Sequence, residues 1–170
     1  MGTSHPESRG WSVRKIRKCS ASTILDVGAG SGTYFNALMK NGYTRARIDA
    51  LEVWQPYIDK FDLKKKYSNV YTADVRDWND FSYDVVIFGD ILEHMSKEDA
   101  IKVWDRVSRQ AGYALIAIPI IHYHQGQIDG NPYEEHIKDD WSHEEVMSTF
   151  SGIVDSWQGN VVGAYWAKFK

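Results

Sequence analysis

The sequence lacks most features that mark secreted, disulfide-bonded or membrane-spanning proteins. It has one cysteine, Cys19, in 170 residues, which excludes an internal disulfide and a zinc site built from cysteines. Its longest apolar stretch, Tyr113 to Ile121, contains Pro119 and is far shorter than the roughly 18 residues of a membrane span. No apolar segment of a secretory signal follows the N-terminus. We therefore expect a cytoplasmic protein without a membrane partner.

The sequence also lacks a strong excess of charge of either sign. The net charge is -3, and 43% of the residues are hydrophobic and 25% charged. This balance is ordinary for a folded globular chain and does not indicate a general nucleic-acid binder, although a local basic patch stays open. At roughly 150 residues per domain, the length predicts one domain.

Short apolar runs alternate with segments of helical spacing after a polar, basic stretch at residues 1–20. That stretch has room for one short helix, and we place the main domain at residues 21–170. Alternation of this kind predicts an α/β fold with a mostly parallel sheet covered on both faces. The predicted strands are residues 23–27, 46–51, 69–72, 83–88 and 113–118, and the predicted helices are residues 33–40, 56–64 and 97–109. In the last helix we expect Ser96 as the N-cap and Ile101, Trp104 and Val107 on the apolar side.

The alternation stops after the fifth strand. Residues 122–140 are polar and aromatic and predict a long loop on the substrate side, within residues 120–142; Trp141 is expected to anchor it. Ser142 and Glu145 have the spacing of a capping box that begins a short helix. Two final apolar runs flank Gly159 and Asn160, which predicts a β-hairpin.

The most specific motif is a strand that runs directly into a glycine-rich turn. Gly28, Gly30 and Gly32 follow Asp26 in the order Asp-Val-Gly-Ala-Gly-Ser-Gly. The spacing lacks the last glycine of the dinucleotide fingerprint, and the carboxylate of Asp26 would repel a pyrophosphate. The motif therefore favours a ligand with a cationic end.

Acidic residues also follow the second and third predicted strands. Glu52 is placed where such folds bind ribose hydroxyls, and Asp74 with Val75 could receive an adenine whose ring Val53 or Trp54 covers. Each acid alone is more often a helix cap or a solvated side chain. Together with the glycine turn they predict S-adenosylmethionine as the ligand.

With these motifs the sequence resembles the class I S-adenosylmethionine-dependent methyltransferases over residues 22–170. Residues 26–32 resemble the first motif of that family, and Glu52, Asp74 and residues 83–86 resemble the next three. The resemblance implies a Rossmann-like three-layer α/β/α sandwich whose seven-stranded sheet has the order 3-2-1-4-5-7-6, with strand 7 antiparallel. It implies a cofactor site at Asp26, Gly28, Ala29, Gly30, Glu52, Val53, Trp54, Asp74, Val75 and Asp90.

The segment after the fourth strand bears on the methyl acceptor. It reads Gly-Asp-Ile-Leu-Glu-His at residues 89–94, unlike the motif with which amino-methylating DNA enzymes hold a flipped base. It resembles small-molecule methyltransferases, some of which bind a divalent metal through an acid-x-x-Glu-His pattern. We favour structural roles for Glu93 and His94 and a place near the methionine end of the cofactor for Asp90, so the sequence predicts no metal.

An acceptor hydroxyl would need a base, and His136 in the long loop is the preferred residue. His94 and Glu93 are further catalytic candidates, and Tyr133 or Glu135 could replace His136. We therefore expect methyl transfer to an oxygen atom of a small molecule. Two alternative functions stay open: a cofactor-binding subunit that needs a partner chain, and an RNA methyltransferase. The sequence disfavours DNA as the acceptor. It is compatible with a homo-oligomer.

Overall fold

A computed structural model describes residues 5–170 and contains one seven-stranded sheet of order β3-β2-β1-β4-β5-β7-β6. Its first five strands are parallel, and β7 runs antiparallel between β5 and β6. The predicted order is thereby confirmed. The strands are β1 (Thr23–Val27), β2 (Arg47–Leu51), β3 (Val70–Tyr71), β4 (Val85–Gly89), β5 (Tyr113–Pro119), β6 (Ile153–Gln158) and β7 (Val162–Lys168).

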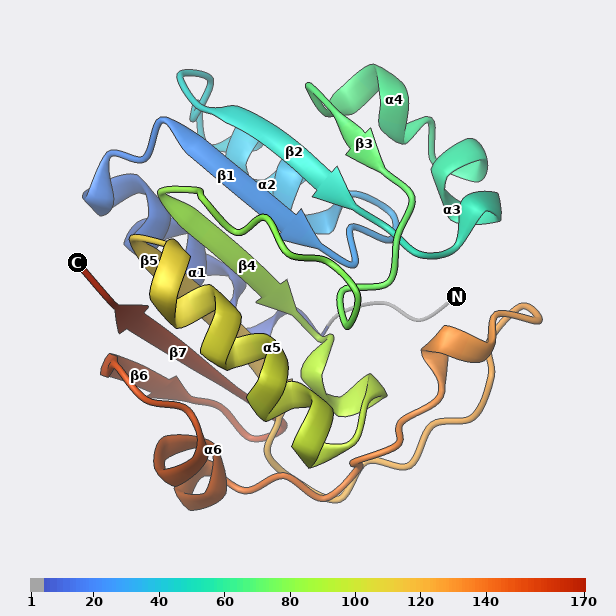
Figure 1. The fold of residues 1–170 in the computed structure, drawn as a ribbon, viewed down its shortest axis with the longest axis vertical. Coiled ribbons are helices and arrows are strands. Elements are labelled where there is room, and N and C mark those ends of the chain that lie inside the picture. The colour runs from blue at the N-terminus through green and yellow to red at the C-terminus, as the bar shows by residue number, and fades with distance from the viewer. Residues whose placement is uncertain (1–4) are drawn as a thin grey trace.

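Helices cover both faces of the sheet, as the apolar composition of its central strands requires. Figure 1 shows α5 in front of the sheet and α1 and α2 behind it. One buried core joins the sheet to α5 and α6, and a second joins it to the other four helices. The helices are α1 (Arg9–Cys19), α2 (Thr33–Lys40), α3 (Gln55–Lys60), α4 (Leu63–Lys66), α5 (Lys97–Gln110) and α6 (His143–Thr149), with short 3-10 turns η1 (Pro6–Ser8), η2 (Leu92–His94) and η3 (Pro132–Glu134).

The predicted helix caps are present at α5 and α6. The hydroxyl of Ser96 accepts a hydrogen bond from the N–H of Asp99, and that of Ser142 accepts one from the N–H of Glu145, both at 3.1 Å. Each bond satisfies one N–H of a first helical turn that has no intrahelical acceptor. These caps fix where α5 and α6 begin after their loops.

Two details of the helix prediction were wrong. The helix expected at residues 56–64 is split into α3 and α4, because Asp62 adopts a left-handed conformation with φ of 51°. Ile101, which we expected on the apolar side of α5, is 37% exposed. Ala100 and Val103 are buried in its place, so the apolar stripe of α5 is rotated from the one inferred from spacing.

The N-terminal segment packs against the sheet and shares one of its two buried cores. Val13 and Ile16 of α1 are buried. The carboxylate of Glu7 accepts hydrogen bonds from the N–H groups of residues 160–162, at the end of the turn between β6 and β7 and at the first residue of β7. These bonds lower the pKa of Glu7. The N-terminal segment therefore contacts the sheet where β6 turns into β7.

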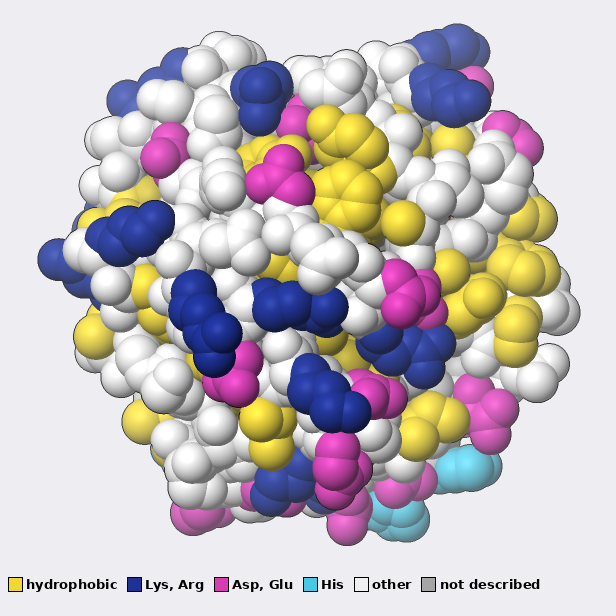
Figure 2. Space-filling view, in the orientation of Figure 1, with side chains coloured by type: hydrophobic (Ala, Val, Ile, Leu, Met, Phe, Trp, Pro, Cys, Tyr) yellow, Lys and Arg dark blue, Asp and Glu magenta, His cyan; other side chains and the backbone are white. Residues whose placement is uncertain are grey.

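No helix in the part of the chain that the structure describes is long and apolar enough to cross a membrane. On the face drawn in Figure 2, basic and acidic side chains are interspersed, and neither sign forms a large continuous area.

Candidate functional site

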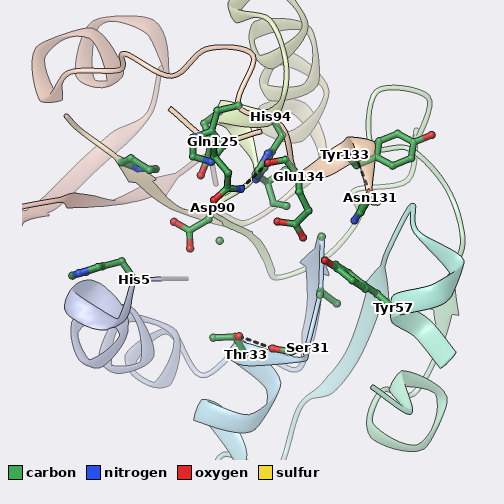
Figure 3. Close-up of a pocket in the computed structure, with 18 of the residues that line it drawn as sticks. His5, Ser31, Thr33, Tyr57, Asp90, His94, Gln125, Asn131, Tyr133 and Glu134 are labelled. Carbon is green, nitrogen blue, oxygen red and sulfur yellow. Dashed lines mark hydrogen bonds between the residues drawn. The ribbon is translucent and has the colours of Figure 1, made fainter. Parts of the chain in front are cut away.

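A pocket lies at the carboxyl ends of β1, β2 and β4, and residues of the loop 120–142 also line it. The space within it measures about 1080 Å³, which includes the open solvent at its mouth. Figure 3 shows the carboxyl groups of Asp90 and Glu134 on one side of this space and Ser31 and Thr33 on the other. His5 of the N-terminal segment also lines it. The loop that sequence analysis placed on the substrate side thus forms part of the pocket wall.

The glycine turn forms the floor of the pocket. Gly28 and Gly30 have φ of 63° and 52°, in the left-handed region that favours glycine. The N–H of Gly28 donates to the carbonyl oxygen of Leu51 at 2.7 Å, which joins the turn to the end of β2. A Cβ at Gly28 would lie 1.9 Å from the Cδ1 atom of Ile91. Glycine is therefore needed both for the turn and for the packing of the segment after β4.

Asp26 lies at the end of β1 beneath the glycine turn and is only 2% exposed. The hydroxyl of Tyr67 donates a hydrogen bond to its Oδ2 atom at 2.6 Å. Burial raises the pKa of Asp26 to about 7, against the lowering effect of the Tyr67 bond. Asp26 is one of the residues that line the pocket, so a positively charged ligand group placed beside its carboxyl group would favour the ionised form.

Glu52, at the end of β2, connects the glycine turn to the start of α3. Its Oε2 atom accepts from the N–H of Gly30 at 2.8 Å, and Oε1 accepts from the N–H of Trp54 at 2.9 Å. Each carboxylate oxygen has a further lone pair that can accept a hydroxyl of a ligand. Glu52 is therefore placed both to shape the turn and to bind a diol such as a ribose.

A second hollow adjoins the pocket and shares Gly28, Val53 and Ile91 with it. Asp74 and Val75 line this hollow, as their predicted place at an adenine requires. Arg76 also lines it, and its Nη2 atom lies 2.6 Å from the Oδ2 atom of Asp74. An adenine amino group placed in this hollow would share the Asp74 carboxylate with Arg76, a partner that the sequence motif did not reveal.

Trp54 is the predicted cofactor residue that the structure places apart from the rest. It lines neither the pocket nor the adjoining hollow among the described residues. Its ring lies 6.1 Å from the ring of Tyr133 in the loop. Tyr133 lines both spaces, so Trp54 supports the aromatic wall from outside.

The segment after β4 turns sharply at Asp90, which has φ of 56° and lines the pocket. Glu93 follows within η2 and is 1% exposed. Neither oxygen of the Glu93 carboxyl group has a hydrogen-bond partner among residues 5–170. Burial, and then the negative charge of Asp90, raise the pKa of Glu93 well above its ordinary value.

His94 and His136 meet over Glu93, although they are 42 positions apart in the chain. Their rings are 4.8 Å apart and nearly perpendicular. Burial lowers the pKa of His94 to about 4, with a further contribution from His136, and burial also lowers the pKa of His136. Both imidazoles are therefore neutral at pH 7 and each presents a lone pair.

The structure thus brings together three of the residues that sequence analysis proposed as catalytic candidates: Glu93, His94 and His136. Sequence spacing linked Glu93 to His94 but gave no reason to place His136 beside them. The residues that it missed are Tyr67, Arg76 and Tyr34, the last of which packs against Gly89 so closely that a Cβ there would lie 2.2 Å from its Cε2 atom. Aromatic residues in helices and loops carry no sequence signal that separates a pocket wall from core packing.

Comparisons with known proteins agree with this architecture. A family model described as a methyltransferase domain matches residues 25–116, which is more than half of the chain. No curated protein sequence matches the chain at a significant level.

Many solved structures share the fold. The N-terminal domain of EvdMO1, crystallised with S-adenosylhomocysteine (SAH) bound, has a TM-score of 0.67 and 14% identity over 96% of this chain and 82% of that chain. The mitomycin 7-O-methyltransferase MmcR has a TM-score of 0.67 and 15% identity over 95% of this chain and 54% of that chain. The small RNA methyltransferase HEN1 has a TM-score of 0.73 and 15% identity over 100% of this chain and 26% of that chain.

Proposed function

Because the chain belongs to the S-adenosylmethionine-dependent methyltransferase family, we propose that it transfers the methyl group to an oxygen atom of a small-molecule acceptor. S-adenosylmethionine is its cofactor and S-adenosylhomocysteine its product. The observation that carries the oxygen assignment is the group of Glu93, His94 and His136 at one end of the pocket. Neutral imidazoles are suited to take a proton from a hydroxyl, which an oxygen acceptor must lose on methylation.

The residues of the pocket divide into a cofactor end and an acceptor end. We place the amino acid part of the cofactor near Asp26 and Asp90, the ribose at Glu52 and the adenine in the hollow with Asp74 and Val75. The acceptor then enters under the loop, where the mouth of the pocket opens. This division puts the acceptor oxygen beside the two histidines.

The proposed reaction is an in-line displacement in which positioning is the main task of the protein. The acceptor oxygen forms a bond to the methyl carbon while the bond from that carbon to sulfur breaks, and its electron pair stays on sulfur. The hydroxyl proton passes to the Nε2 atom of His136 or His94. Glu134, Tyr123 and Gln125 also line the pocket.

A panel of acceptors tests the oxygen assignment. The purified protein and methyl-labelled cofactor are incubated with phenols, catechols, aliphatic alcohols, carboxylic acids, amines and single-stranded RNA, and labelled products are identified by mass spectrometry. We expect labelled ethers or esters from the oxygen acceptors. Label that enters only amines or only RNA, or that enters an acceptor only after a partner chain is added, would contradict this proposal and favour one of the alternatives.

Cofactor binding is expected to stabilise the fold. At a concentration of about 100 times its dissociation constant, S-adenosylhomocysteine should add about 2.7 kcal/mol to the free energy of unfolding, and NAD should add nothing. Glu52→Gln should weaken this stabilisation because an amide loses the charge that binds hydroxyls and the N–H groups of Gly30 and Trp54. Thermal unfolding with and without ligand measures the effect. Asp155→Asn, at the surface, is the matched control and should keep the wild-type stabilisation. Stabilisation by NAD would refute the cofactor assignment.

A further inference from the structure

We propose that Glu93, His94 and His136 form a binding site for one first-row divalent cation of the Mn²⁺ or Zn²⁺ type. These residues offer three ligand atoms, one carboxylate oxygen of Glu93 and one ring nitrogen of each histidine. The three atoms lie within 4.8 Å of one another. Sequence analysis predicted no metal because one short segment offered too few ligands. The structure adds His136, from a distant loop, to that segment.

The Glu93 carboxyl group is the first argument. It is 1% exposed, and neither of its oxygens has a hydrogen-bond partner among residues 5–170. A buried carboxylate without a partner is costly, whereas buried charges in proteins are normally paired or bound to a metal. A structural role as a helix cap would show bonds from backbone N–H groups to the Glu93 carboxylate, and within the described part of the chain it accepts none. A cation between Glu93 and the two imidazoles would supply the missing partner.

The hydrogen bonds of the two histidines are the second argument. The Nδ1 atom of His94 lies 3.1 Å from the carbonyl oxygen of Glu135, and the Nδ1 atom of His136 lies 2.6 Å from that of Tyr123. A carbonyl oxygen only accepts, so Nδ1 carries the proton in both rings and Nε2 keeps its lone pair. Metal-binding histidines are held in this way, with the second ring nitrogen donating to a backbone carbonyl.

The backbone around the cluster is the third argument, because it fixes the loop to the segment after β4. The N–H groups of Ile137 and Lys138 both donate to the carbonyl oxygen of Glu93, at 2.8 and 3.0 Å, and the N–H of His136 donates to the carbonyl oxygen of Gln125 at 2.9 Å. These bonds hold His136 over Glu93. Bonds from a metal of this type to nitrogen and oxygen are about 2.0–2.2 Å long, so small side-chain rotations bring the three ligand atoms into one coordination shell.

The donor set suggests the type of cation and its task. Two imidazoles and one carboxylate suit first-row divalent cations better than Mg²⁺ or Ca²⁺, which prefer oxygen ligands. Three protein ligands leave positions open to the pocket. If the proposed oxygen methylation holds, an acceptor hydroxyl bound there would lose its proton to water more readily because the cation lowers its pKa. The imidazoles would then hold the cation in place of taking the proton.

The test measures Mn²⁺ binding directly, apart from catalysis. Protein freed of metal with a chelator is titrated with Mn²⁺ at pH 7.5, and free Mn²⁺ is followed by electron paramagnetic resonance. We expect one tight site per chain in the wild type, and at least about tenfold weaker binding in Glu93→Gln and in His136→Asn. Two variants from different segments keep the test valid if one of them fails to fold, which thermal unfolding reports.

The loop itself offers a matched control. His122 and His124 both lie near the Oδ2 atom of Asp139, at 3.3 and 3.4 Å, and their side chains are 72% and 76% exposed. The double variant His122→Ala/His124→Ala should keep the tight site. Loss of binding in this control, unchanged binding in Glu93→Gln and His136→Asn, or no tight site in the wild type would overturn the inference.

The proposed function is tested on the same samples by a separate readout. S-adenosylhomocysteine binding and methyl transfer to oxygen acceptors are measured with and without Mn²⁺. Full methyl transfer in metal-free protein would overturn the catalytic task proposed for the cation and leave the function standing. A tight Mn²⁺ site in protein that methylates no oxygen acceptor would support the site and refute the function.

Discussion

His136→Ala is expected to lower kcat for an oxygen acceptor by about 10²- to 10⁴-fold, the usual contribution of a general base. The affinity for S-adenosylhomocysteine should change little, because the proposed function assigns His136 to the acceptor and Asp26 and Glu52 to the cofactor. His122→Ala, on the same loop but exposed, should keep the wild-type kcat. Steady-state kinetics and calorimetric titration of the product measure the two quantities separately.

The condition that restores turnover to the His136→Ala variant distinguishes two roles for the imidazole ring of His136. If the ring takes the proton, turnover should recover partly as the pH rises, because the acceptor then ionises unaided. If the ring binds a cation, excess Mn²⁺ at constant pH should restore turnover. Unchanged kcat at every pH, together with loss of activity in His94→Ala, would place the base in the segment after β4 and leave the loop as a cover only.

The sheet could be predicted from the sequence because its signals are local. Buried parallel strands read as continuous apolar runs, and glycines follow β1 wherever the backbone must take a positive φ. The break between α3 and α4 was not predictable in this way. Asp62 adopts a left-handed conformation that aspartate tolerates but rarely requires.

The candidate site was predictable only where its residues follow strand ends. Asp26, Glu52 and Asp74 lie at the carboxyl ends of adjacent strands, so the parallel topology alone brings them to one edge. His136 reaches Glu93 through a loop whose path depends on backbone hydrogen bonds from Ile137 and Lys138. Loop conformation of this kind has no periodicity in the sequence, which is why the three-residue cluster emerged only from the structure.

Asp26→Asn is expected to weaken cofactor binding and to stabilise the ligand-free protein. Removing one partner of a buried, hydrogen-bonded charge pair costs about 2–5 kcal/mol, or about 30- to several-thousand-fold in affinity at 1.4 kcal/mol per tenfold. Asparagine keeps the size of the side chain and an oxygen that accepts from Tyr67. The loss should therefore fall on the cationic end of the cofactor and not on the packing beneath the glycine turn.

The stability effect follows from the raised pKa of Asp26, about 7 in the folded protein against 3.8 for an ordinary aspartate. Between these two pH values the folded state binds more protons at this group than the unfolded state does, so its contribution to stability falls as the pH rises. The cost is complete above pH 7 and absent below pH 3.8. The unfolding free energy of Asp26→Asn should thus exceed that of the wild type by more at pH 8 than at pH 5. Because both proteins contain His94 and Glu93, the effect of their titration cancels when the two unfolding free energies are subtracted.

The affinity of the wild type for S-adenosylhomocysteine should fall as the pH drops below 7, by up to about tenfold per pH unit, while the affinity of Asp26→Asn should not change with pH. Urea unfolding and calorimetric titration at both pH values measure these differences, and equal pH profiles for the two proteins would show that the Asp26 carboxylate does not contact the cationic end of the cofactor.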